Sequence, residues 1–305
     1  MNAALLAYRK LAKLFKNWGL IMNLYDPCVW NKDVNCEQLT IMFHIDDLLM
    51  AHVQDSVITE FIRKLDREYT THDPLTVTRG LLHEYLGQSL DFSYKGQCAM
   101  SQYDFIKKLW LELPETLKGP YKCTPAPEYL FKISLDSPEL RVQKKDQYHK
   151  TTAKILWLSW RTRPDTQIAT RFHCARVKKP TEEDWEKLRH LLGYIWKTRF
   201  LPLIMGMDDS GNVVIYVDGA HAVHSDGKGH SGLFVTMDTG ALINMSKKLG
   251  VNTVSSTETE IVSTGERFPK CTWFRYFRGA QGSALKEDIL MQDNQSCILL
   301  QKNYP

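Results

Sequence analysis

Several signatures of specialised protein classes are missing from this sequence. Its seven cysteines include no Cys-x-x-Cys pair and no dense spacing, which makes a zinc site or a disulfide framework a poor interpretation and favours a reduced, intracellular setting. No apolar run approaches the roughly 18 residues that a membrane-spanning helix needs. No internal repeat or low-complexity tract is visible, so the chain is expected to be soluble, globular and without a membrane partner.

Acidic residues are absent before Asp26. The basic, amphipathic segment Met1–Lys16 therefore has the composition of an organellar transit peptide. The favoured alternative is a surface helix with its lysines outside. Its residues expected to face a core are Leu5, Leu11, Leu14 and Phe15.

The composition of the remaining chain is ordinary. At 305 residues and 43% hydrophobic, the chain can bury sizeable cores, and its length suggests about two domains. The net charge of +4 permits a polyanionic partner, but 24% charged residues of both signs do not by themselves decide for one.

Apolar spacing in the first part predicts a hairpin, a helix, a hairpin and a helix, followed by a helical block. The linker Thr124–Pro127 cannot continue either type of element. The expected elements are a hairpin over Thr40–His52, a helix over Asp55–Tyr69, strands Tyr85–Tyr94 and Gln97–Ser101, a helix to Glu112 capped by Ser101 and Asp104, and helices within Asp146–Thr198, broken at Thr162–Asp165 and Pro180, the last capped by Thr181 and Asp184.

A second domain is expected to begin near Gly211, with a run of strands before one long helix. The expected strands are 212–217, 231–237, 241–245 and 251–254, then a helix from Ser256 to about Gly279, a strand over 288–291 and a helix from Asn294.

Two groups of acidic residues are candidates for metal ligands. Asp46 and Asp47 lie at the expected hairpin tip between apolar segments, where a divalent cation would offset the cost of burying them. For an arbitrary Asp-Asp pair, a solvated turn is the usual explanation. Asp218 and Asp293 each end a strand, and Glu260 lies in the intervening helix. If the strands are parallel neighbours, all three carboxylates share one edge; otherwise they are unconnected surface acids.

An ordered series of short motifs resembles the polyprotein of copia-type LTR retrotransposons. Phe43-His-Ile-Asp-Asp47 resembles the Tyr-x-Asp-Asp box of reverse transcriptases, with His44 where Tyr is commoner. The later signals, in family order over nearly the whole chain, are Tyr85-Leu-Gly87, Leu109 with Thr124-Pro125, Thr162-Arg-Pro-Asp165, Tyr216-Val-Asp218, Ser246-Lys-Lys248, Ser255-Ser-Thr-Glu-Thr-Glu260 and Asp293-Asn-Gln-Ser296.

This resemblance implies an α+β, multidomain fold. Residues 1–121 would be a partial reverse transcriptase palm and thumb, 122–210 a helical connection, and 211–305 a ribonuclease H-like α/β domain with a mixed sheet. The implied chemistry is two-metal phosphodiester cleavage or synthesis on an RNA–DNA hybrid or template-primer, with Mg²⁺, or Mn²⁺, as cofactor. The implied metal-ligand and catalytic residues are Asp46, Asp47, Asp218, Glu260 and Asp293, with Glu258 at a variable position.

The chain also departs from the family pattern. Only 45 residues precede Asp46, and none matches the upstream polymerase motifs with their further metal-binding Asp; the ribonuclease H tail with its His is missing as well. The expectation is therefore a fragment truncated at both ends, associated with other polyprotein parts in a cytoplasmic virus-like particle or the nucleus. Two alternatives to an enzyme fragment stay open: a noncatalytic nucleic-acid-binding module, and an inactive product of a decayed retroelement.

Three further residue groups carry weaker interpretations. The cluster of His221, His224 and His230 is read as a loop rather than a metal site. Four tryptophans at helical positions are read as core rather than as platforms for stacking bases: Trp157, Trp160, Trp185 and Trp196. Basic residues that either track a phosphate backbone or form a solvated face are Lys247, Lys248, Arg267, Lys270, Arg275 and Arg278.

Overall fold

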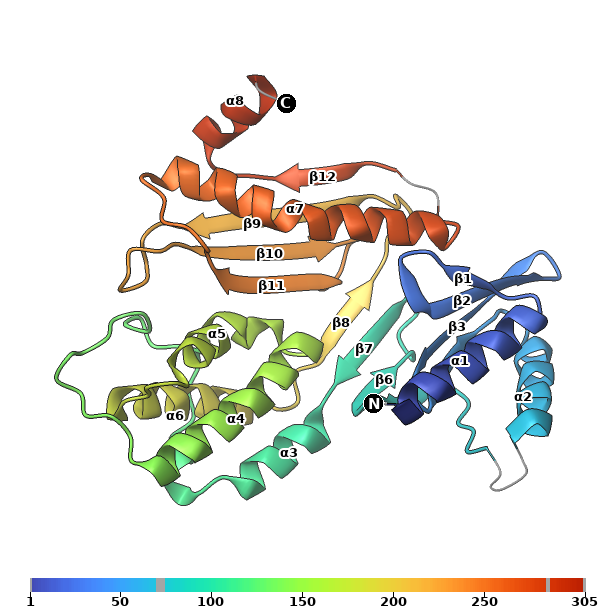
Figure 1. The fold of residues 1–305 in the computed structure, drawn as a ribbon, viewed down its shortest axis with the longest axis horizontal. Coiled ribbons are helices and arrows are strands. Elements are labelled where there is room, and N and C mark those ends of the chain that lie inside the picture. Colours follow the sequence, from blue (N-terminus) through green and yellow to red (C-terminus); the bar gives the residue numbers. More distant parts are fainter. Residues whose placement is uncertain (1, 70–74, 284–285, 304–305) are drawn as a thin grey trace. The chain divides into compact units, whose positions relative to one another are not determined.

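The computed structural model describes residues 2–69, 75–283 and 286–303. These residues form eight α-helices and several β-sheets, so the predicted α+β class is confirmed. The chain divides into two compact units (Figure 1). Unit 1 comprises Met1–Leu86 and Thr272–Leu285, and unit 2 comprises Gly87–Cys271 and Lys286–Pro305.

Unit 1 contains an antiparallel sheet in the order β1-β2-β3-β4, with two helices packed on it. Its elements are α1 (Asn2–Asn17), β1 (Ile21–Asn23), β2 (Asp26–Val34), β3 (Glu37–His44), β4 (Asp47–Ala51), α2 (Asp55–Tyr69) and β5 (Leu82–Tyr85). Alternate β3 side chains face inwards, as the period of two in a strand requires. The buried core consists of Leu11, Phe15, Leu20, Trp30, Leu39, Ile41, Phe43, Phe61 and Leu65.

The expectations for unit 1 are largely confirmed. The helix Asp55–Tyr69 has the predicted bounds, and the predicted hairpin forms between β3 and β4. Helix α1 packs through Leu11 and Phe15, but Leu5 is exposed, so its predicted contact with the core is wrong. Residues 4–7 of α1 are exposed, and the packing of this helix on the core begins at Tyr8.

The middle of the chain, in unit 2, begins with strands β6 (Gln88–Asp91) and β7 (Gln97–Ser101), and β7 also pairs with β8 (Leu203–Gly206). The predicted strand Tyr85–Tyr94 is interrupted at Leu86 and Gly87, both of which have positive φ. The predicted cap of the next helix is also wrong. Helix α3 (Tyr103–Glu112) begins after Gln102, because Ser101 is the last residue of β7 and is paired with Ser89 of β6.

Helices α4 (Val142–Arg161), α5 (Gln167–Arg176) and α6 (Glu182–Lys197) form the predicted helical block, with short 3-10 turns at Glu115–Leu117 and Pro164–Thr166. The breaks lie where proline was expected to end a helix. At the start of α6, the Thr181 side chain accepts a hydrogen bond from Asp184 N–H, and the Asp184 carboxylate accepts one from Thr181 N–H, so the predicted cap is a full capping box. Apolar faces of all four helices α3–α6 share one core.

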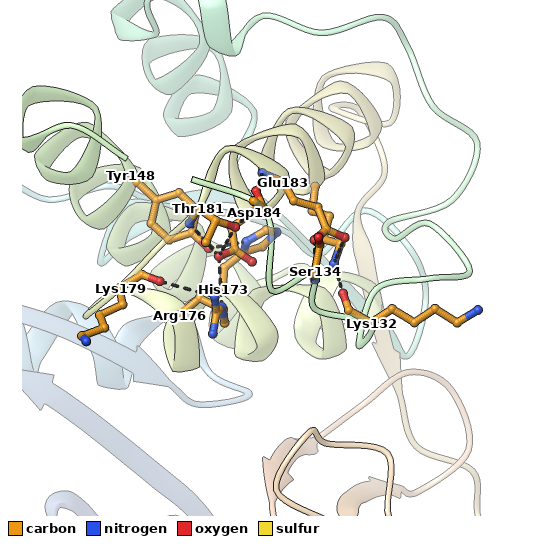
Figure 2. Close-up of polar contacts among 11 residues, drawn as sticks. Lys132, Ser134, Tyr148, His173, Arg176, Lys179, Thr181, Glu183 and Asp184 are labelled. Atoms are coloured by element: carbon orange, nitrogen blue, oxygen red, sulfur yellow. Dashed lines mark hydrogen bonds and ion pairs between the residues drawn. The ribbon is translucent and has the colours of Figure 1, made fainter. Parts of the chain in front are cut away.

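A polar network joins the segment before α4 to the first two turns of α6 (Figure 2). Lys187 is almost fully buried, donates to the Lys132 carbonyl and pairs with the Glu183 carboxylate, which also accepts from Ser134 N–H. Next to it, His173 bonds the Tyr148 hydroxyl at 2.7 Å. Burial, followed by the Lys187 charge, lowers the pKa of His173 to about 3, so this histidine is neutral at physiological pH.

The last part of the chain forms a mixed sheet in the order β11-β10-β9-β12, with β12 parallel to β9 and the other pairs antiparallel. The elements are β9 (Val213–Ala220), β10 (His230–Thr236), β11 (Ile243–Lys248), α7 (Ser256–Ala280), β12 (Asp288–Met291) and α8 (Gln295–Asn303). The first part of α7 lies along one face of this sheet (Figure 1). The strand predicted over 251–254 is wrong. Val251 and Val254 are exposed in an irregular segment, so their β-branched side chains do not pack on a sheet.

Candidate metal centre

Three acidic side chains from three different elements meet in unit 2. Asp218 lies near the end of β9, Asp293 lies two residues after β12, and Glu260 lies in the second turn of α7. Because β12 runs parallel to β9, with Met291 opposite Tyr216, the C-terminal ends of both strands lie at the same end of the sheet. One ligand atom from each carboxylate lies within 4.8 Å of the other two.

A close approach of α7 to β9 makes this meeting possible. Gly219 follows Asp218, and a Cβ atom placed on it would lie 2.6 Å from the Ser263 hydroxyl and 3.1 Å from the Thr259 carbonyl. A larger residue would therefore push the helix away from the strand. At this distance the backbone N–H of Gly219 donates to Glu260 Oε1 at 3.1 Å. The glycine thus brings the helix carboxylate to the strand that carries Asp218.

Glu260 differs from its two partners in its environment. Its side chain is buried, whereas Asp218 and Asp293 are exposed. Burial raises the pKa of Glu260, hydrogen bonds from Gln292 and Gly219 lower it, and the charges of Asp218 and Asp293 raise it again, with a net upward shift. The site therefore holds its own negative charge at a cost, which a bound cation would remove.

Gln292 is a site residue that the sequence analysis missed. Its Nε2 donates to Glu260 Oε2 at 3.3 Å, and its Oε1 accepts from the backbone N–H of Asn294 at 2.9 Å. Asn294 in turn caps α8 through the N–H of Cys297. The available signal was a polar residue directly between a strand and a candidate ligand, but a glutamine in that position is too common to single out.

The donor set suits a hard divalent cation. Carboxylate oxygens are the preferred protein ligands of Mg²⁺ and Ca²⁺, and neither histidine nor cysteine belongs to the group. Glu260 is held by two hydrogen bonds, while the exposed Asp218 and Asp293 carboxylates are accessible to an ion and to a substrate. The residues present thus fit a divalent metal.

Asp46 and Asp47 form a different arrangement in unit 1. Both are exposed at the β3–β4 turn, so the desolvation cost expected for them does not arise. No third His, Cys, Asp or Glu joins them in a metal-sized group among the residues that the structure describes. Ile45, the first residue of the turn, has φ of 55°, a conformation that a β-branched residue rarely adopts.

The three histidines have partners of their own. His224 Nε2 lies 3.1 Å from His230 Nδ1, and His230 Nε2 lies 2.6 Å from the Ser246 hydroxyl. Burial, followed by the charges of neighbouring residues, lowers the pKa of His230 to about 4. His221 bonds the hydroxyls of Thr253 and Thr259, so these side chains brace the loop before β10 against the start of α7.

The tryptophans and basic residues divide between core and surface. Trp185 is buried and Trp196 stacks on Trp110, as expected, but Trp157 and Trp160 are exposed, so the core prediction is wrong for both. Arg267 is buried and donates to the Ser231 hydroxyl, and Lys248 pairs with Asp226. In the part of the chain that the structure describes, no helix is long and apolar enough to cross a bilayer.

Comparison with known proteins identifies transposon sequences as relatives. The chain is 25% identical to a putative transposon Ty5-1 protein of Saccharomyces cerevisiae over 82% of this chain and 88% of that protein. It is 24% identical to the retrovirus-related Pol polyprotein from transposon TNT 1-94 of Nicotiana tabacum over 97% of this chain, but spans only 22% of that polyprotein. An uncharacterized mitochondrial protein of Arabidopsis thaliana is 23% identical over 80% of this chain and 98% of its own length.

No family model and no solved structure matches the chain. The relatives nevertheless confirm the predicted resemblance to retrotransposon polyproteins, because two of them are transposon products that align with most of this chain. The chain is thus similar to retrotransposon proteins over most of its length.

Proposed function

We propose that this chain is a fragment of a copia-type reverse transcriptase and ribonuclease H that acts on RNA–DNA hybrids, with its phosphodiester chemistry in unit 2. The observation that carries the proposal is the meeting of Asp218, Glu260 and Asp293 within 4.8 Å from three separate elements. The retroelement relatives support a nucleic-acid substrate for such a site.

The proposed domains follow the resemblance. Residues 1–121 would correspond to part of a palm and thumb, residues 122–210 to a connection, and residues 211–305 to a ribonuclease H-like domain. The mixed sheet β11-β10-β9-β12 with α7 on one face supports the last assignment. The exposed pair Asp46 and Asp47 would belong to the palm, a role supported by the sequence resemblance and by their place at a hairpin tip.

Each residue of the site has a definite part in the proposal. Asp218 and Asp293 present exposed carboxylates to the substrate side, and Glu260 is held between the Gly219 N–H and the Gln292 amide. Together they would hold Mg²⁺, or Mn²⁺. When bound, such ions make water a better nucleophile and neutralise charge on the leaving oxygen. Gln292 is a positioning residue in this proposal, since it acts through its hydrogen bond to Glu260.

The test is cleavage of an RNA–DNA hybrid by the whole chain in Mg²⁺ and in Mn²⁺. We expect Asp218→Asn and Glu260→Gln each to lower the cleavage rate at least about 100-fold, as the loss of charge stabilisation in an active site does. Mn²⁺ should support more cleavage than Mg²⁺, because Mg²⁺ requires near-ideal octahedral geometry.

A matched control lies one half-turn away on the same helix. Glu258 accepts a hydrogen bond from Val254 N–H and is not part of the acidic group, so Glu258→Gln keeps the acceptor and should keep the activity. Cleavage that survives Asp218→Asn would assign the activity elsewhere. Binding of the hybrid without any cleavage in either metal would favour the alternative, a noncatalytic nucleic-acid-binding module, and neither binding nor cleavage would favour a decayed product.

A further inference from the structure

Helix α4 carries two large aromatic side chains on its outer face. Trp157 is 38% exposed and Trp160 is 54% exposed, although the opposite side of the same helix is buried against α5 and α6. His149, Ala153 and Trp157 follow one another at intervals of one turn, and Trp160 continues this exposed stripe. Exposed tryptophans in adjacent turns lose much of their hydrophobic stabilisation, so a contact that covers them would restore it.

Each tryptophan has an arginine guanidinium against its ring. The Arg161 guanidinium carbon lies 4.3 Å from the centre of the Trp157 ring, and that of Arg171 lies 5.0 Å from the centre of the Trp160 ring. The Trp157–Arg161 pair lies within α4, whereas the Trp160–Arg171 pair joins α4 to α5. Each pair thus combines a flat indole ring with a planar guanidinium that lies over it.

Basic residues outnumber acidic ones on the two helices that carry these pairs. Helix α4 has five Lys or Arg residues and one acid, Asp146, and α5 has two Arg and no acid. Three of the cations are neutralised: Lys144 pairs with Glu182, Lys154 with Glu112 and Arg176 with Asp184. Among the residues that the structure describes, no acid forms an ion pair with the remaining four, which are Lys145, Lys150, Arg161 and Arg171.

We propose that this face, defined by Trp157, Trp160, Arg161 and Arg171, binds single-stranded nucleic acid. Unpaired bases would stack on the exposed indole rings, and the arginines with Lys145 and Lys150 would contact the phosphates. Base–aromatic stacking combined with a basic surface is how sequence-independent binding of single strands is achieved. The inference goes beyond the proposed cleavage of hybrids, since none of these residues belongs to the acidic group.

The chemistry of the face decides between possible occupants. A duplex keeps its bases stacked on one another, so it could use the cations but not the indole faces. A protein partner would use the apolar surface, but four unpaired cations would require a strongly acidic partner surface. A single strand satisfies both features, because it has free base faces and one negative charge per nucleotide.

The experiment measures binding of a fluorescently labelled oligothymidylate of about 15 nucleotides, in EDTA, to the whole chain. We expect binding to be accompanied by quenching of tryptophan fluorescence. Trp160→Ala and Trp157→Ala should each weaken binding by about 5- to 150-fold. With up to four phosphate contacts, the logarithm of affinity should fall with the logarithm of salt concentration with a slope near −2.8, and Arg161→Ala should reduce that slope by about 0.7.

Conservative variants separate stacking from simple burial of apolar surface. Trp160→Tyr keeps a ring and should retain most of the affinity, whereas Trp160→Leu is apolar without a flat π-face and should lose it. Trp110→Phe is the matched control. Its ring stacks on Trp196, with the ring centres 4.8 Å apart, and packs against the core of α3–α6 rather than standing on the exposed face of α4, so the variant should bind like the wild type.

Failure of this proposal is distinguishable from failure of the proposed cleavage. Asp218→Asn and Glu260→Gln should bind the single strand as the wild type does, since the assay contains no divalent ion. Undetectable binding, equal affinity for the duplex of the same length, or full retention of affinity by Trp160→Leu would each overturn the proposal. Circular dichroism spectra that match the wild type establish that a variant which loses binding is folded.

Discussion

The two acidic groups of this chain contrast in how they are built. Asp46 and Asp47 are adjacent in sequence, yet they stand exposed on a hairpin turn without a third carboxylate in the metal-sized range among the described residues. Asp218, Glu260 and Asp293 are far apart in sequence, yet a parallel strand pair and one helix bring them within 4.8 Å. Sheet topology, and not proximity along the chain, creates the cluster.

The contrast extends to the surroundings of the carboxylates. Glu260 is buried, accepts hydrogen bonds from Gly219 and Gln292, and has its pKa raised by burial. The hairpin acids are exposed, and Ile45, which precedes them, has a positive φ. A cation lowers the free energy of a site more when its carboxylates are partly buried and repel one another than when they are already solvated. We therefore expect a divalent metal to bind more tightly to the group of Asp218, Glu260 and Asp293 than to Asp46 and Asp47.

The largest expected effect is on metal-dependent stability. Mg²⁺ or Mn²⁺ at ten times its dissociation constant should stabilise the wild type by about 1.4 kcal/mol, because the ion binds the folded state. Asp218→Asn should abolish this gain, since it removes one of three ligands. The measurement is the midpoint of thermal unfolding with and without the ion.

The hairpin supplies the control for that experiment. Asp47→Asn should leave the metal-induced stabilisation unchanged, because Asp47 is exposed and has no third acid beside it in the described part of the chain. Loss of the stabilisation in Asp47→Asn, with retention in Asp218→Asn, would reverse the comparison and place the stronger metal site in unit 1.

The same two sites show which features of the structure can be predicted from the sequence. The β3–β4 hairpin and the strand that precedes Asp293 follow from local patterns, because apolar alternation and turn residues act over a few positions. The parallel pairing of β12 with β9 could be stated only as a condition, since partner choice between strands depends on contacts that no local pattern encodes. The role of Gln292 depends on that pairing and could not be predicted.

The predictions that the structure contradicts also have a physical explanation. The β-branched content of Val251 and Val254 favours a strand, but both side chains are exposed, and β-propensity depends on a half-buried surface on which the side chain can pack. The helical spacing of Trp157 and Trp160 predicts that they lie in a core, but both are exposed. Spacing shows which residues share one face of a helix, and it does not show whether another element packs on that face. The division into domains at residues 121 and 210 stays a prediction.

A second, smaller effect concerns pH in the absence of metal. The pKa of Glu260 is raised in the folded state, so its protonated form is favoured there. Its contribution to stability is fully present below the ordinary pKa of 4.5 and is lost as pH rises through the higher folded-state value. Glu260→Gln should therefore unfold at a higher temperature than the wild type at pH 7, and the difference should shrink towards pH 4. A stabilisation by Glu260→Gln that is equally large at pH 7 and at pH 4 would contradict the raised pKa of Glu260.

The smallest expected effect tests the strain at the hairpin. Ile45 has φ of 55°, and an L-residue in the left-handed region costs about 1–2 kcal/mol, whereas glycine adopts it freely. Glycine also gains up to about 1 kcal/mol of chain entropy in the unfolded state, which offsets part of the relief. Because the Ile45 side chain is more than half exposed, little packing is lost on replacement. Ile45→Gly should therefore stabilise unit 1 by about 0.5 kcal/mol in denaturant titration. Destabilisation by more than about 1 kcal/mol would mean that the isoleucine side chain, and not only the turn, holds the two aspartates in place.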